Sequence, residues 1–242
     1  MLDAIKVDKN KIIIDLVDIK DADLEEVLKH IKELVYNNTI AVFYVISDEY
    51  ANVTDEFYFF KALVETVKAN FNTFLMLKTR YFSDTKFFDS VFALGVDALT
   101  LSIRRDDEAS TSFNKTISYI TKLWPSGAIF TDVVAIDCTD DEIKSRIDFY
   151  ANLKVIPKII KSEGCGDKDA PSCVRDVILS SLKSNGVSLK WVMNFELCNV
   201  ILENAKGGAT RKIAGRVAFE LASLRRKVMV KEVESSFDSA SL

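Results

Sequence analysis

Short runs rich in Ile, Val and Phe alternate along this chain with longer segments whose apolar residues recur at the helical period. Such alternation is typical of repeated βα units, in which helices connect parallel strands. The runs predict eight strands: Ile12–Val17, Thr39–Ser47, Thr73–Lys78, Ala98–Ile103, Ile129–Ile136, Val155–Lys161, one between Val187 and Glu203, and Val228–Val233. The periodic segments predict seven helices: Asp23–Tyr36, Asp55–Asn70, Asp84–Leu94, Ser112–Leu123, Asp140–Ala151, Val174–Ser184 and Arg211–Arg226.

Eight strands and seven helices without a Pro/Ser-rich linker favour one domain, a (β/α)8 TIM barrel with parallel strands over residues 1–233. A doubly wound open sheet is the structural alternative. Residues 234–242, ESSFDSASL, are expected to form a disordered tail. The seventh strand is either VSLKWVMNF or LCNVILE, and we favour the second because it leads directly into a glycine-rich turn.

Composition excludes several classes of function. The net charge is -4, and basic residues are mixed with acidic ones, so no basic stripe is present for nucleic acid. No apolar stretch is long enough for a transmembrane helix, and the segment Met1–Lys11 lacks the apolar core of a signal peptide, so we expect a cytoplasmic protein without a membrane partner. The four cysteines form no C-x-x-C pair and are expected to be reduced thiols.

The chain has a single histidine, His30, beside the apolar stripe of a predicted helix. It is expected at the surface, away from any active site. Catalytic devices that depend on histidine, and histidine-based metal sites, are therefore not expected. No metal and no cofactor are predicted.

Lys158 lies within the predicted sixth strand, KVIPKIIK. Because strand side chains alternate, Lys158 faces the same way as Ile156 and Ile160. Burial among apolar neighbours favours an uncharged amine, which is the nucleophile that forms a Schiff base with a ketone or aldehyde. The alternative is that Lys158 faces the helices and extends to water.

A second candidate site is the sequence NAKGGATRK at residues 204–212, between a predicted strand and a long helix. Glycines, a hydroxyl and cations at a helix N-terminus form an anion site, because free amides, helix dipole and side-chain charge agree in sign. An ordinary glycine turn with solvated basic residues is the alternative. If the site exists, a carboxylate or phosphate would bind Gly207, Gly208, Thr210, Arg211 and Lys212.

Together, Ile156-Pro157-Lys158-Ile159 on a sixth strand and KGGATR at 206–211 after a seventh resemble the type I 3-dehydroquinate dehydratases. The resemblance implies a class I Schiff-base barrel and lyase chemistry, with Lys158 forming the imine and Arg211 binding the substrate carboxylate. An ungapped match places Lys212 at the arginine position instead. Lys78 would be an accessory cation in place of the family's third-strand arginine. The resemblance also implies a homodimer.

The chain departs from this family at its catalytic histidine, its E-x-R-x-D strand and its closing substrate loop. The sequence therefore predicts a divergent barrel that binds a small keto or hydroxy carboxylate, with altered or lost dehydratase activity. Two alternatives stay open: a non-catalytic barrel that binds a ligand or a protein, and a cluster-free barrel similar to radical-SAM enzymes, suggested by GVDALTLS at residues 95–102.

Overall fold

The computed structural model describes residues 4–8, 11–19, 21–38, 42–47, 53–71, 73–134, 139–160 and 172–188. Its strands are β1 (Ile5–Asp8), β2 (Lys11–Asp15), β3 (Val42–Ser47), β4 (Phe74–Arg80), β5 (Ala98–Ser102), β6 (Ile129–Val134) and β7 (Ile156–Ile160). Its helices are α1 (Leu16–Ile19), α2 (Leu24–Asn37), α3 (Val53–Asn70), α4 (Thr85–Ala93), α5 (Arg105–Glu108), α6 (Phe113–Leu123), α7 (Asp140–Asn152) and α8 (Ser172–Ser184).

The strands form one sheet in the order β1-β2-β3-β4-β5-β6-β7. All neighbours from β2 to β7 are parallel, whereas β1 pairs antiparallel with β2. The prediction of an α/β protein with a mainly parallel sheet is confirmed. Within the described residues the sheet is open, so closure into a barrel is not established.

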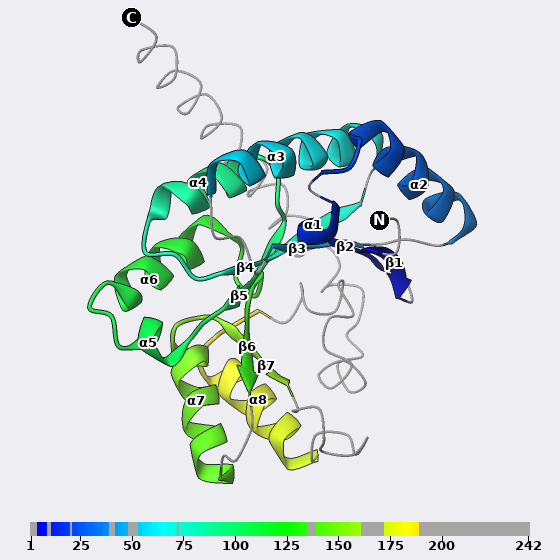
Figure 1. Cartoon of the computed structure of the whole chain (residues 1–242). Helices are drawn as coiled ribbons and strands as arrows, with labels where there is room; N and C mark the ends of the chain where they lie inside the picture. Colours follow the sequence, from blue (N-terminus) through cyan, green and yellow to red (C-terminus); the bar gives the residue numbers. More distant parts are fainter. Residues whose placement is uncertain are drawn as a thin grey trace, which may run out of the picture.

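The helices form a layer that follows one face of the curved sheet from α2 to α7 (Figure 1). Phe43 of β3 faces this layer, because its ring centroid lies 5.3 Å from that of Phe71, directly after α3. Trp124, after α6, also lies there: it packs 5.0 Å from Phe92 of α4 and donates a hydrogen bond to the Val96 carbonyl. Phe43, Phe92 and Trp124 are buried and Phe71 is partly buried, so the main core lies between the sheet and the helices.

Local sequence explains where several helices begin. The carboxylates of Asp23 and Asp84 accept hydrogen bonds from free backbone amides at the starts of α2 and α4. At α7 the cap is Thr139, which forms a capping box with Glu142. The predicted helix Asp140–Ala151 begins at the same residue as α7.

Predicted elements agree well with the described ones. Six predicted strands correspond to β2–β7, and six predicted helices correspond to α2, α3, α4, α6, α7 and α8. The strand β1 and the single turns α1 and α5 were not predicted, since they are too short to show a period. Most of the predicted seventh-strand region, the last strand, the last helix and the tail fall outside the described residues.

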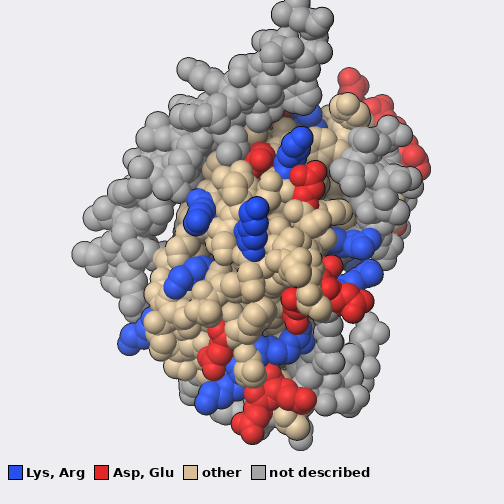
Figure 2. Space-filling view, turned by 90° about the vertical axis from the view of Figure 1, so that its left-hand side faces the viewer, with Lys and Arg blue, Asp and Glu red and all other residues tan. Residues whose placement is uncertain are grey.

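The outer surface carries mixed charge. Figure 2 shows Lys and Arg side chains interspersed with Asp and Glu over one face of the described part, without a continuous basic area. No helix in that part is long and apolar enough to span a membrane.

Candidate functional site

The face of the sheet turned away from the helix layer is here called the inner face. Nearer the start of the strands it carries apolar residues, including Met76, Phe130 and Ile156, which are fully buried. Polar residues follow two positions later on four strands. They are Lys78 on β4, Thr100 on β5, Asp132 on β6 and Lys158 on β7.

Three of these polar residues form one charged cluster, here called the Lys–Asp–Lys cluster. The Lys158 Nζ donates to Asp132 Oδ1 at 3.1 Å, and the Lys78 Nζ lies 3.2 Å from Asp132 Oδ2. The side chains of Lys78, Asp132 and Lys158 are 23%, 10% and 21% exposed, respectively. The two lysines therefore share a carboxylate in a place that water reaches poorly.

The cluster lies toward the carboxyl ends of the parallel strands. Lys78, Asp132 and Lys158 each stand two residues before the end of their strand. In α/β proteins with parallel sheets, this is the edge at which ligands bind and catalysis takes place. The cluster is therefore a candidate functional site.

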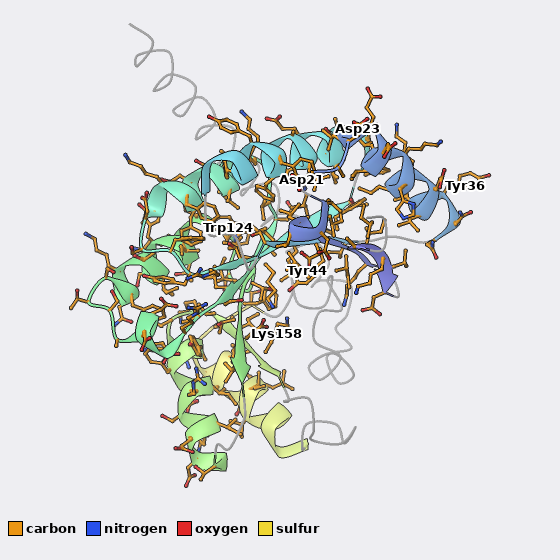
Figure 3. The ribbon with its side chains drawn as sticks, viewed as in Figure 1. Asp21, Asp23, Tyr36, Tyr44, Trp124 and Lys158 are labelled. Atoms are coloured by element: carbon orange, nitrogen blue, oxygen red, sulfur yellow. The ribbon has the colours of Figure 1, made fainter. Side chains whose placement is uncertain are left out.

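Tyr44 of β3 lies beside this cluster on the inner face. Burial is the main reason that the pKa of its phenol is raised above the ordinary value, and the Asp132 charge acts in the same direction. The charges of Lys158 and Lys78, together with the Thr100 hydroxyl, act in the opposite direction. Figure 3 shows Tyr44 and Lys158 on the same side of the sheet, away from Trp124.

The structure brings together two of the residues that the sequence singled out. Lys158 and Lys78 meet at Asp132, and Lys158 shares its face with the buried Ile156, as the alternation of the strand predicts. The predicted anion-site residues Gly207, Gly208, Thr210, Arg211 and Lys212 lie outside the described residues. His30 lies on α2, in the helix layer.

Sequence reasoning missed Asp132 and Tyr44. A signal for Asp132 was present, because an acidic residue inside the apolar run Ile129–Ile136 is unusual for a buried parallel strand. Tyr44 gives no such signal, since tyrosine is common in strands.

Metal-binding side chains do not gather in the described part of the chain. No group of three or more His, Cys, Asp or Glu residues there could hold a metal ion. Aspartate and lysine in the cluster form ion pairs instead.

Comparison with known proteins gives no family assignment. No protein-family model matches the chain. No curated protein matches it either.

Proposed function

We propose that this protein is a Schiff-base (β/α)8 barrel similar to the type I dehydroquinate dehydratases, which binds a small keto or hydroxy carboxylate at Lys158. The barrel is supported by the strand order, because six parallel strands follow one another without reversal. A doubly wound sheet reverses its order and carries helices on both faces. The predicted strands at 187–203 and 228–233 would complete the eight.

The observation that carries the proposed chemistry is the Lys–Asp–Lys cluster at the carboxyl ends of β4, β6 and β7. A lysine at this edge can reach a ligand bound over the inner face. Its partner carboxylate can receive the proton that an ammonium must lose before it becomes a nucleophile. Asp132 is placed for this transfer, at 3.1 Å from Lys158 Nζ.

The reaction balances without a cofactor. Proton transfer from Lys158 to Asp132 gives a neutral amine, which adds to the ketone carbon of the ligand. The amine loses a proton as the ketone oxygen gains one, which yields a carbinolamine. Protonation and loss of its hydroxyl as water then leave an iminium ion. Water reverses the sequence and releases the ligand.

The ligand carboxylate would be bound by cations. Lys78 contacts the same carboxylate as Lys158 and would be one of these cations. Arg211, Lys212 and the Gly207-Gly208 turn are the further residues that the family resemblance assigns to the carboxylate. Because the family's histidine has no counterpart here, we propose altered or lost dehydratase activity.

A non-catalytic barrel that binds a ligand or a protein is the second candidate. It is favoured by the ion pair between Lys158 and Asp132, since a carboxylate partner stabilises the ammonium form, which is not a nucleophile. On this reading Asp132 orders two lysines, and no covalent bond to a ligand forms.

Reductive trapping distinguishes the two candidates. The protein is treated with sodium borohydride together with dehydroquinate or pyruvate, and its intact mass is measured. Hydride reduces a C=N bond to a stable secondary amine, so imine formation gives an adduct of predictable mass. The Schiff-base proposal predicts an adduct that peptide mapping locates at Lys158.

Three lysine variants make this test specific. Lys158→Met should abolish the adduct, whereas Lys61→Met, an exposed lysine on α3, should leave it unchanged. Lys78→Met tests which amine of the cluster reacts. Absence of an adduct with every keto compound would overturn the Schiff-base proposal and leave the non-catalytic one.

A further inference from the structure

Tyr44 reaches across the sheet toward the cluster. It belongs to β3, and its register partner Met76 on β4 stands two residues before Lys78 on the inner face. The Tyr44 hydroxyl nevertheless lies beside Thr100, which is on β5 and pairs in register with Lys78. The phenol therefore extends across β4 toward the carboxyl ends of the strands, where the cluster lies.

Thr100 at this point is an incompletely satisfied polar group. Its residue is fully buried, and its hydroxyl makes no hydrogen bond of standard geometry within the described structure. The contact with Tyr44 is looser than a standard hydrogen bond, although it lowers the pKa of the phenol. The Thr100 hydroxyl thus has hydrogen-bonding capacity left to hold the Tyr44 hydroxyl.

Every charge of the cluster acts on the Tyr44 hydroxyl. Lys158 has the largest effect of the three charged groups, followed by Asp132 and Lys78. Burial outweighs them and raises the pKa, so the phenol is protonated at neutral pH and can donate its proton. The positive charge of Lys158 favours the phenolate that would result.

We infer that Tyr44 transfers the proton during formation and hydrolysis of the imine at Lys158, with Thr100 positioning its hydroxyl. This inference rests on the proposed function. It supplies a group for the role that histidine has in the family that the chain resembles. The ligand class is the same, a small 2-keto acid or related ketone.

Atoms and charges balance in the proposed step. As the nitrogen lone pair forms the C=N bond, the carbinolamine C–O bond breaks, and the departing oxygen takes the phenolic proton of Tyr44. The products are iminium, water and phenolate. In the reverse direction water adds to the iminium carbon and its proton returns to the phenolate. The iminium charge forms beside the phenolate and stabilises it.

Other described proton donors fit this role less well. Asp132 is bonded to both lysines. Tyr81 also has a buried hydroxyl without a hydrogen-bond partner, but it packs 5.2 Å from Phe113 of α6, in the helix layer. Tyr81 is therefore a matched control for removal of a buried hydroxyl.

The test is the rate of reductive trapping with pyruvate, measured by intact mass over a range of pyruvate concentrations. Tyr44→Phe keeps the aromatic ring and removes the hydroxyl group that donates the proton. We expect it to lower the trapping rate at saturation by about 10²- to 10⁴-fold, the usual effect of losing a general acid. Tyr81→Phe should trap at the wild-type rate. The pyruvate concentration that gives half of the maximal trapping rate should change little in Tyr44→Phe, because the ring still packs in the same place.

Thr100→Val is the second variant, used with thermal unfolding to check that each protein folds. Loss of one hydroxyl contact should slow trapping by about 3- to 10-fold. Wild-type trapping rates in a folded Tyr44→Phe protein, or in Thr100→Val if Tyr44→Phe does not fold, would overturn the role of Tyr44 and leave the Schiff base intact. Absence of trapping in the wild type would overturn both.

Discussion

Asn has nearly the same volume as Asp. Even so, replacing Asp132 by Asn should lower the free energy of unfolding strongly. The carboxylate contacts the ammonium groups of Lys78 and Lys158 at 3.2 and 3.1 Å. Asparagine can still accept a hydrogen bond from one lysine through its oxygen. It carries no charge, so two ammonium groups would face each other across a neutral amide.

The magnitude follows from these contacts. A hydrogen bond to a charged group contributes about 1.5–3 kcal/mol, and one of the two is lost. Removing one partner from a fully buried ion pair costs about 3–5 kcal/mol. Lys78 and Lys158 keep 23% and 21% exposure, so water offsets part of that cost. We expect Asp132→Asn to lower the free energy of unfolding by about 2–4 kcal/mol.

Urea unfolding measures this change in the free energy of unfolding, provided that the slope of that free energy against urea concentration is the same in all variants. Lys78→Met and Lys158→Met should each cost about 1 kcal/mol, because each removes one ion pair and leaves the contact of Asp132 with the other lysine. Combining Asp132→Asn with Lys158→Met should cost less than the sum of the two single changes, since both remove the same contact.

The critical result is how the cost of the double variant compares with the costs of the two single variants. If the double variant were less stable than Asp132→Asn by the full cost of Lys158→Met, the two residues would be energetically independent. The assignment of Asp132 as the carboxylate shared by two lysines would then be wrong. A cost of Asp132→Asn below about 0.5 kcal/mol, the range of ordinary surface changes, would lead to the same conclusion.

Two further predictions concern groups outside the cluster. Asp97 accepts hydrogen bonds from the Leu75 amide at 2.9 Å and from Lys68 at 2.5 Å. Asp97→Ala should therefore lower the free energy of unfolding, measured in urea, by about 2–4 kcal/mol, and Asp97→Asn should lower it by less. Equal losses in the two variants would refute a role for the charge. Burial and a hydrogen bond to the Asp89 carboxylate raise the pKa of Tyr119 to about 12. Burial and a hydrogen bond to the Glu108 carboxylate also raise the pKa of Tyr150. The folded protein therefore holds protons that the unfolded chain releases near pH 10, so the urea midpoint should fall as pH rises above about 10, and a constant midpoint between pH 9 and 11 would contradict this.

The order of elements was predictable because each long element carries its own periodic signal. Apolar runs such as Thr73–Lys78 identify buried parallel strands, and Asp23 or Asp84 identifies a helix start. Shorter elements have no period to detect. The turn α5 illustrates this: the run from Arg104 to Glu108 has no apolar residue, yet it contains a helical turn whose Glu108 binds Arg146 of α7 at 3.1 Å.

The site was predictable only as far as alternation within a strand allows. The facing of Lys158 follows from its two-residue spacing to Ile156, and Lys78 was found through the family resemblance. Their meeting at Asp132 depends on the registers of β4, β5, β6 and β7. Register between distant strands is set by packing of the whole sheet, which a single strand sequence does not contain.

Asp132 connects Lys78 and Lys158, because each of its carboxylate oxygens contacts one of the two ammonium groups. The two lysines belong to β4 and β7, which are not neighbours in the sheet, so this carboxylate on β6 brings together two amines that the strand order keeps apart. The proposed Schiff-base function requires Lys158 to release a proton before it attacks a ketone, and Asp132, at 3.1 Å from its Nζ, is the described carboxylate that would accept that proton. The two roles of Asp132, in holding the lysines together and in taking the proton, therefore rest on the same pair of contacts.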